Sequence, residues 1–409
     1  EELISTPAHQ DEQDWRTVRQ TIADFLGDAL GRGDNNPPIS LQELIWDMVS
    51  ELMEDPEPTP EEEKRDGEGG FDPMTLAINT VRGEAMHAVI NYGLWVARNL
   101  KDKTVEVKIP QEVTDVLDKH LDKKQDPSLA IHSIYGWRAP NISYLNRPWL
   151  EANKEKIFVK DSPDYLLAAW EGYLSNNVIK EVFQILKPLY FEFIPLLGTF
   201  EKKGFRANDV DQRFPQHIMV TYVSDAENDD LVEFFFKNAH PKARAEALNF
   251  AGRVVLRQQE GLRDKEQVLK RLAELWEKRI SLLGETLEVE ELQEFGWWFK
   301  FSPVDQKETL ELMTKTLELT KGKIDVPYEI VEEMVKYVPE YPLESIKLLQ
   351  LLAEAERERH EITYKRNEYR EVFRLIKEGD NKDAKQIKDD VINHLGSKGL
   401  IEEFRDLLE

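Results

Sequence analysis

Apolar residues return every three or four positions along most of this chain, which is the spacing of one face of an α-helix. The clearest stripes comprise Val268, Leu269, Leu272, Leu275, Trp276 and Leu283; Ile346, Leu349 and Leu352; and Ile387, Val391 and Leu395. Only residues 104–110 alternate as a strand would. Because a lone strand has no partner for its backbone groups, we interpret this segment as an extended connector. The pattern therefore predicts an all-α fold.

Acidic or hydroxyl residues followed directly by proline mark several helix starts. They are Asp72–Pro73, Asp126–Pro127, Ser162–Pro163 and Ser302–Pro303. Asp or Ser can cap the free N–H groups of a first turn, and proline at the next position loses no hydrogen bond. The helices between such marks are short and closely connected, which favours antiparallel neighbours. Successive hairpins stack most simply into an irregular α-solenoid of the HEAT or TPR kind, with a compact multi-helix bundle as the rival.

Charge and composition narrow the functional classes. The chain has 54 Lys and Arg against 79 Asp and Glu, a net charge of -25, which disfavours a nucleic-acid partner. Cysteine is absent, so disulfides, thiolate metal sites and a cysteine nucleophile are excluded, and a reducing cytoplasm is the expected compartment. No apolar run approaches the roughly 20 residues that cross a bilayer, so no membrane contact is expected.

An acidic stretch divides the chain into three parts. Residues 54–70, rich in Pro, Gly and Glu, have almost no apolar side chain to bury, which predicts a disordered loop or linker. Residues 1–53 form an amphipathic segment expected to pack on the array, and residues 71–409 are the predicted helical-repeat solenoid. The first residue is Glu1 within a charged stretch, and we expect the sequence to be part of a longer protein.

The segment "INTVRGEA" raises the question of chemistry, because it places Asn79, Arg82 and Glu84 close together. One helix is predicted from Pro73 to about Leu100, with Arg82 among apolar neighbours. Such an arginine needs a carboxylate or free carbonyls to offset its desolvation. Gly83 is expected where another helix comes close, and Asn79 is expected to bond across that contact. We therefore interpret Asn79, Arg82 and Gly83 as structural.

A search for catalytic signatures finds none that is specific. No two histidines lie three or four residues apart as in a zinc-protease helix, and no phosphate-binding glycine loop or Gly-x-Ser-x-Gly elbow occurs. We therefore predict no catalytic residue, no cofactor and no metal. A hydrolase built from scattered carboxylates and histidines remains as a lesser alternative.

Aromatic and basic clusters are the better candidates for binding a partner. The sequence "FGWWFKFSP" contains Trp297, Trp298 and Phe301, and the locally basic segment 364–377 contains Arg366, Tyr369 and Arg370. Trp, Tyr and Arg concentrate at interface hot spots, although an inter-repeat core and a solvated face are the plain alternatives. The basic segment could also steer an acidic partner. We predict these six residues as partner-binding.

Several phrases occur in an order that resembles one group of proteins. They are "DPMTLAINTVRGEAMHAVINYGLWV", "DVLDKHLD" with "DPSLAIHSIYG", "AAWEGYL" with "VFQILKPLY", "FGWWF", and the closing "YVPEYPLESIKLL…YREVFRLIKEGD…INHLGSKGLIEEFRDLLE". Together they resemble the C-terminal helical-repeat regions of bacterial anti-phage defence proteins. That group includes STAND-type NTPases of the Avs kind and related proteins with sirtuin-like effector domains. The resemblance covers residues 71–409.

The resemblance implies a sensor module that grips a protein of an invading phage, with the effector elsewhere in the parent protein. A phage structural or packaging protein is then the expected partner, and the parent protein could join copies of itself. A structural or oligomerisation scaffold is the second hypothesis, and the carboxylate–histidine hydrolase is the third.

Overall fold

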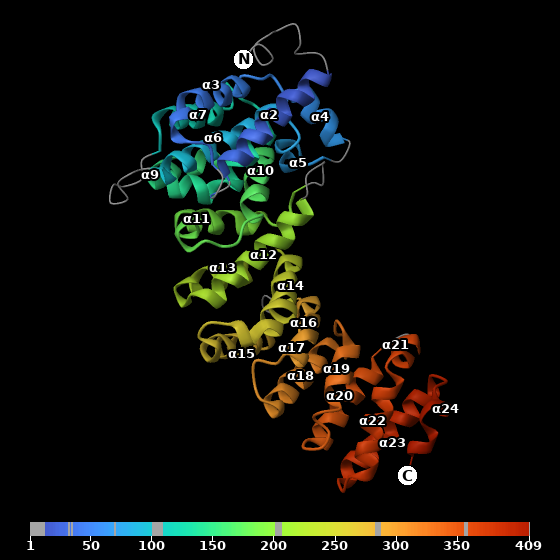
Figure 1. The fold of residues 1–409 in the computed structure, drawn as a ribbon. Helices are drawn as coiled ribbons and strands as arrows, with labels where there is room; N and C mark the ends of the chain where they lie inside the picture. Colours follow the sequence, from blue (N-terminus) through green and yellow to red (C-terminus); the bar gives the residue numbers. More distant parts are fainter. Residues whose placement is uncertain are drawn as a thin grey trace. The chain divides into compact units, whose positions relative to one another are not determined.

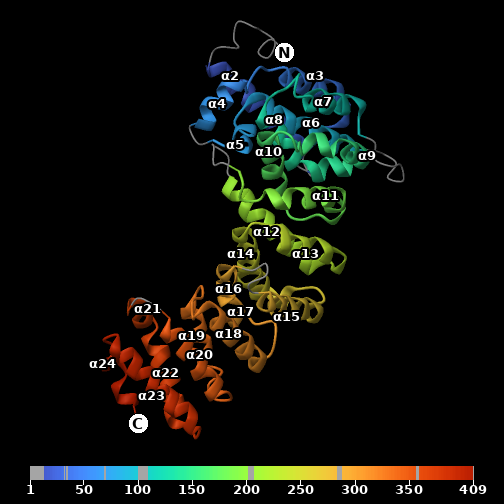
Figure 2. The same cartoon turned by 180° about the vertical axis from the view of Figure 1, so that it is seen from behind.

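The structure is a computed structural model that describes residues 13–31, 33, 36–68, 71–99, 109–200, 207–282, 288–355 and 359–408. Within these residues every regular element is helical and no strand occurs (Figures 1 and 2). The all-α prediction is therefore confirmed. Residues 104–108 of the predicted connector lie outside the described part of the chain.

The helices form two compact units, residues 1–217 (unit 1) and 218–409 (unit 2). Each unit is considered by itself. The segments predicted as separate parts, residues 1–53 and 54–70, both belong to unit 1, and the boundary between the units falls inside the predicted solenoid.

Unit 1 contains the helices of the first half of the chain. They are α2 (Gln13–Gly31), α3 (Gln42–Met53), α4 (Pro60–Glu68), α5 (Pro73–Ala77), α6 (Val81–Arg98), α7 (Gln111–Leu121), α8 (Leu129–Trp137), α9 (Ala139–Ile157), α10 (Pro163–Leu174), α11 (Lys180–Phe193) and most of α12 (Ala207–Ser224), with short 3-10 turns at Ile39–Leu41 and Ile194–Leu196. Figures 1 and 2 show α2 and α6 side by side, and α3 also packs on α6. The N-terminal segment therefore packs on the helices that follow it.

Close backbone contact and aromatic packing hold the middle of unit 1 together. Helices α8 and α10 cross where Gly136 faces the Ala169 carbonyl and Gly172 faces the Ser133 carbonyl. A Cβ at Gly136 would lie 1.9 Å from the carbonyl oxygen of Ala169, so no larger residue fits this crossing. Below it, the Trp170 ring lies 5.0 to 5.1 Å from the rings of Tyr190, Phe193 and Phe214. This aromatic cluster is part of the unit's core.

The predicted single helix from Pro73 to Leu100 is wrong, because the chain breaks it into α5 and α6. Thr80 adopts an extended conformation (φ -132°, ψ 152°), and its hydroxyl donates to the Leu76 carbonyl (2.8 Å). The break lets the end of α5 fold back on α6. A Cβ at Gly83 would lie 2.1 Å from the Ala77 carbonyl oxygen, so the absence of a side chain there permits this approach. Asp72 caps α5 as predicted, accepting from the Thr75 amide (2.7 Å).

The predicted disorder of residues 54–70 is wrong for residues 60–68, which form α4. The sequence Thr59-Pro60-Glu61-Glu62 is a capping box. The Glu62 carboxylate accepts from the Thr59 amide (3.1 Å), and the Thr59 hydroxyl accepts from the Glu62 amide (3.2 Å). This cap, together with hydrogen bonds from arginines of other helices described below, orders a segment that has few apolar side chains to bury.

Three of the other predicted caps also differ from the structure. Helix α8 is capped by Ser128, which accepts from the Ile131 amide (3.1 Å), instead of Asp126. Ser162 makes no capping bond to α10. The helix after Ser302 begins only at Gln306 and is capped by Asp305.

Unit 2 contains the remaining helices. They are α13 (Asp229–Asn238), α14 (Pro241–Phe250), α15 (Lys265–Ser281), α16 (Val289–Gln293), α17 (Gly296–Lys300), α18 (Gln306–Thr320), α19 (Pro327–Met334), α20 (Pro342–Glu354), α21 (Arg359–Tyr364), α22 (Arg366–Glu378), α23 (Lys382–Ser397) and α24 (Ile401–Phe404), with short turns of 3-10 helix at Ala226–Asn228, Leu256–Gly261 and Arg405–Leu407 and of π-helix at Ala251–Val255. Alternate helices pack on one another: α14 on α16, α16 on α18, and α18 on α20.

Candidate functional site

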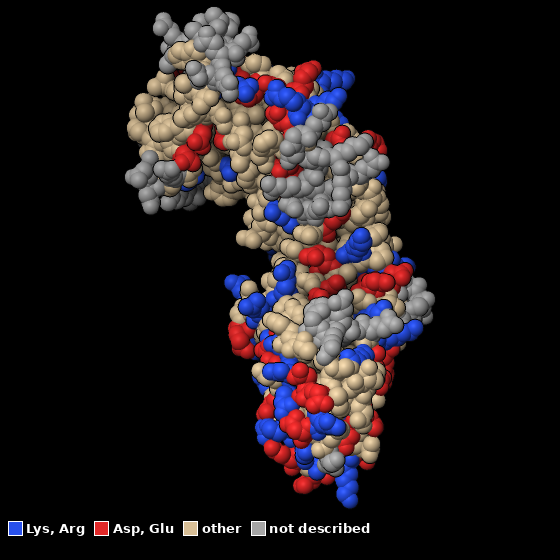
Figure 3. Space-filling model, turned by 90° about the vertical axis from the view of Figure 1, so that its right-hand side faces the viewer, with Lys and Arg blue, Asp and Glu red and all other residues tan. Residues whose placement is uncertain are grey.

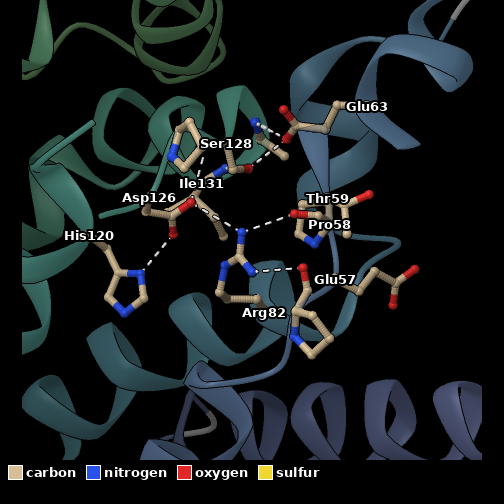
Figure 4. Close-up of polar contacts among 12 residues, drawn as sticks. Glu57, Pro58, Thr59, Glu63, Arg82, His120, Asp126, Ser128 and Ile131 are labelled. Carbon is tan, nitrogen blue, oxygen red and sulfur yellow. Dashed lines mark hydrogen bonds and ion pairs between the residues drawn. The ribbon is translucent and has the colours of Figure 1, made fainter. Parts of the chain in front are cut away.

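Buried polar side chains of unit 1 gather around Arg82 (Figure 4). We call the set of Glu63, Arg82, His120, Asp126 and Ser128 the Arg82 cluster. Arg82 stands in the first turn of α6, and its guanidinium donates to the carbonyl oxygens of Asp55 (2.8 Å), Pro56 (3.0 Å) and Pro58 (3.0 Å). It also pairs with the Asp126 carboxylate at 3.1 Å. Arg82 thus has both kinds of acceptor that its desolvation requires, and it joins the acidic segment to the start of α8.

Asp126 serves three donors at once. Its two oxygens accept from Arg82, from the Ser128 amide (3.1 Å) and from His120 Nδ1 (2.7 Å). Burial acts to raise the pKa of this carboxyl, but the hydrogen bond from His120 and the charge of Arg82 together lower it. Asp126 therefore stays ionised and works as the anchor of the cluster.

Glu63 extends the cluster from α4 to the N-terminus of α8. Its carboxylate accepts from the amides of Leu129 and Ala130 (both 2.9 Å) and from the Ser128 hydroxyl (2.5 Å). An anion at this position satisfies free N–H groups and complements the helix dipole. Burial nevertheless raises the pKa of Glu63. Residues 55–63, called the acidic strap below, thus cap α8 through the Glu63 carboxylate and accept hydrogen bonds from Arg82 of α6 through their backbone carbonyls.

The Arg82 cluster contains Ser, His and Asp side chains, yet their bonds do not form a nucleophilic triad. The Ser128 hydroxyl donates to Glu63, so its proton is engaged by a carboxylate and not by an imidazole. The side chains of His120 and Asp126 are only 5% and 3% exposed, which keeps a substrate away from them. This arrangement joins helices, and it supplies no nucleophile for hydrolysis.

The other two residues interpreted as structural take different places. Gly83 allows the close approach of Ala77, as described above. Asn79 does not bond across that contact, because its side-chain amide donates back to the Thr75 carbonyl (2.6 Å). Asn79 therefore closes the end of α5.

The predicted aromatic partner surface is partly a core. Trp298 is fully buried, donates to the Leu248 carbonyl (2.9 Å) and packs 4.9 Å from the Phe295 ring. Trp297 and Phe301 are half-buried, and their rings stack at 6.1 Å on the other side of α17. The prediction that Trp298 contacts a partner is wrong, because α14 and α15 cover the face that it occupies: its indole donates to Leu248, and its ring lies 5.9 Å from that of Trp276.

The predicted basic partner surface is largely neutralised within unit 2. Tyr369 is buried, with its ring 6.3 Å from that of Phe404, so its prediction as a contact residue is wrong. Arg366 pairs with Glu403 (2.9 Å), and both terminal nitrogens of Arg370 reach Asp406 (2.9 and 2.5 Å). These pairs leave little free charge to attract an acidic partner.

A groove between α13 and α15 is the strongest candidate binding site in unit 2. Its volume is about 420 Å³. Val232 and Phe236 of α13 and Leu275 of α15 form an apolar floor, each 3 to 5% exposed. The volume and the apolar floor suit an anchoring side chain of another protein.

Charged side chains of both signs surround this floor. Asp229, Glu233 and Lys237 come from α13, and Glu274 and Lys278 come from α15. Lys278 pairs with Glu233 across the groove at 2.6 Å, with both side chains more than half exposed. Exposed pairs of this kind contribute at most about 1 kcal/mol, so a partner can replace them at small cost.

A buried ion cluster lies behind the groove floor. Glu291 of α16 is fully buried and accepts from Arg244 Nε (2.6 Å) and from Arg279 (2.8 Å). Burial acts to lower the pKa of Arg279, opposed by Glu291. The Arg279 guanidinium also lies 4.8 Å from the centre of the Phe236 ring. The cluster therefore supports the floor of the groove from within.

Sequence reasoning missed the groove residues. The apolar residues of "DDLVEFFFKN" indicate a helix with a buried face, and this much was readable. A groove arises only when that helix lies beside α15, which begins far along the chain. Spacing within one helix carries no information about such a neighbour.

Comparisons with known proteins give no relative: no family model, no curated protein and no solved structure matches the chain. Among the described helices, none is both long and apolar enough to span a membrane. Within the same residues no group of three or more acidic or histidine side chains is placed to hold a metal ion.

Proposed function

We propose that this chain is a non-catalytic protein-recognition module, the phage-protein sensor region of a larger bacterial antiviral defence protein. The observation that supports recognition is the groove between α13 and α15, with its apolar floor and exposed rim of both charges. The motif order described above supports the place in antiviral defence.

The chemistry of the rim defines the partner segment. Three carboxylates and two lysines surround the floor, and the whole chain carries a net charge of -25. Glu233 pairs with Lys278 and Asp229 with Arg271, so a basic partner segment would have to replace these pairs. A segment with an apolar anchor flanked by Lys or Arg would meet the carboxylates and would be attracted over long range. We therefore propose a basic, apolar-anchored segment of a phage structural or packaging protein as the partner.

We also propose that the helices form an irregular α-solenoid. In unit 2 the packing of α14 on α16, α16 on α18 and α18 on α20 supports this, as does the contact of α17 with α19. Contacts between alternate helices are the pattern of stacked helical pairs, in which each helix meets its equivalent in the next pair.

Capture from phage-infected cell lysate tests the proposal. The full chain, tagged and immobilised, should retain one predominant phage protein, and a double variant Glu233→Lys with Glu274→Lys should lose at least about tenfold of it. Both substituted residues are exposed on the rim, so the fold should persist. Quantitative mass spectrometry of the retained proteins gives the readout.

A matched control carries the same charge change away from the groove. Glu290→Lys with Glu318→Lys, both exposed, should retain the phage protein as the unchanged chain does. Retention of no phage protein by a folded chain would contradict sensing. Equal loss from both double variants would show a general charge effect and remove the groove from the proposal. Self-association in sedimentation without any retained partner would favour the scaffold function.

A further inference from the structure

A second cavity, in unit 1, has a chemistry opposite to that of the whole chain. It lies where the end of α2, the second half of α6 and the start of α9 meet, and its volume is about 540 Å³. Arg98, Arg138, Asn91, Asn141 and Tyr144 contribute to its lining, and no described acidic residue does. Two arginines without a carboxylate are unexpected in a chain where acidic residues outnumber basic ones by 79 to 54.

Arg138 is held firmly but lacks a counter-charge. Its guanidinium donates to the Asn91 side-chain oxygen, and its Nε is buried without a hydrogen-bond partner. Asn91 in turn donates to the Gly27 carbonyl (2.9 Å), which fixes the amide and hence the arginine. Burial lowers the pKa of Arg138 to about 10. A half-buried guanidinium of this kind is stabilised by an anion more than an exposed one would be.

Arg98 adds a second cation to the same cavity. It donates to the Leu30 carbonyl at the end of α2, and it forms no ion pair with a described residue. The contrast with Arg82 is direct, since Arg82 has Asp126 and Arg19 has Asp55 at 2.7 Å. In the cavity, the position that a carboxylate would take is open to an anion from outside the chain.

Two further side chains suit a phosphate-bearing molecule. The Asn141 side chain makes no hydrogen bond with a described residue, so its amide is free to donate to an oxyanion. Tyr144 is 62% exposed and lines the cavity, so its ring offers a face for stacking. The volume lies within the range of small-molecule sites, about 300 to 1,000 Å³.

We propose that this cavity binds the phosphate group of a small molecule, with Arg98 and Arg138 as its cationic ligands and Asn141 as a neutral donor. Arginine presents planar paired donors that match phosphate oxygens. Free phosphate and a nucleotide share this chemistry, and they differ in whether a base is present to stack on Tyr144.

Isothermal titration calorimetry of the full chain with AMP and with inorganic phosphate tests the site. We expect saturable binding of AMP with a Kd below about 1 mM. Asn141→Asp is the most informative variant, because it preserves shape and adds a carboxylate to the cavity that both arginines line. It should weaken both probes at least about tenfold, and Arg98→Gln, on an exposed side chain, should do the same.

Asn177→Asp, an exposed change of equal charge in unit 1, is the matched control and should leave both affinities unchanged. Tyr144→Ala should weaken AMP alone if a nucleotide is the ligand. Equal binding of AMP and phosphate, unaffected by Tyr144→Ala, would assign the site to free phosphate. No saturable binding of either probe up to about 10 mM, or equal affinity for Asn141→Asp and the unchanged chain, would overturn the proposal.

Discussion

The two units bury arginine in different ways. In unit 1, Arg82 distributes its donors over three backbone carbonyls and one carboxylate. In unit 2, Arg244 and Arg279 share the single carboxylate of Glu291, and Arg244 has one backbone acceptor besides, the Ala239 carbonyl (3.0 Å). Carbonyl acceptors belong to the backbone and persist through substitution, whereas a shared carboxylate is lost with one residue. The two arginines of unit 2 therefore depend on one side chain for their counter-charge.

The surfaces differ as well. On the face shown in Figure 3, acidic and basic side chains are interspersed over unit 2 (the lower part of the view), whereas uncharged residues cover much of unit 1. Interspersed charges pair within the surface, as Arg374 does with Glu371 and Glu378 (both 2.6 Å). Exposed pairs of this kind stabilise little, so we expect the substitutions with the largest effects on stability to be those of buried charges.

The largest effect is expected from Glu291→Gln. The substitution leaves two buried guanidinium groups without a counter-charge, which should lower the free energy of unfolding of unit 2 by about 3–5 kcal/mol. Urea denaturation followed by pulsed hydrogen exchange, read on peptides of each unit, measures this change. Peptides of unit 1 serve as the internal reference.

Glu290→Gln makes the same chemical change at the neighbouring position and is the matched control, since the Glu290 side chain is exposed. It should change stability by less than about 0.5 kcal/mol. A loss in Glu291→Gln no greater than in this control would show that Arg244 and Arg279 do not need their shared carboxylate. The contrast between the units would then fail.

A smaller loss, about 2–3 kcal/mol, is expected in unit 1 from Arg82→Met. Asp126 keeps His120 and the Ser128 amide as donors, while the carbonyls of the acidic strap lose theirs. Amides of residues 55–63 should lose exchange protection first. Arg65→Met, an exposed arginine of α4, should cost less than about 0.5 kcal/mol. If Arg82→Met lowered the free energy of unfolding as much as Glu291→Gln does, backbone carbonyl acceptors would not make unit 1 less dependent on a single side chain than unit 2.

Much of the local structure could be predicted from the sequence. The Asp72 cap, the need of Arg82 for acceptors and the small residue at Gly83 each depend on chemistry within a few positions. The capping box at Thr59 and Glu62 was equally readable, but the low apolar content of its surroundings favoured disorder. The segment is ordered by bonds to other helices, among them Arg82.

Long-range placement could not be predicted. Asp126 fits the pattern of a helix cap, yet Arg82 and His120 take up its oxygens, and Ser128 caps instead. Trp298 and Trp297 are adjacent in sequence and differ in burial, because helical periodicity separates their faces without showing which one other helices cover. The groove and the arginine-lined cavity both require helices distant in sequence.

Lowering the pH should destabilise unit 1 more than unit 2, and the effect of each residue should be smaller than that of the substitutions above. The buried histidines of the described chain, such as His132 and His217, all lie in unit 1, and burial lowers the pKa of each of these two to about 4. A folded pKa below the usual 6.5 means that stability is complete above that pH and falls as the pH drops toward 4.

Between pH 7.5 and 5.0, His132 alone should cost unit 1 about 1–2 kcal/mol, measured by the same unit-resolved denaturation. His132→Gln keeps a donor for the Ile157 carbonyl but does not titrate, so it should lose less over this interval. An equal acid loss in both units, or in the variant and the unchanged chain, would show that these imidazoles do not set the difference.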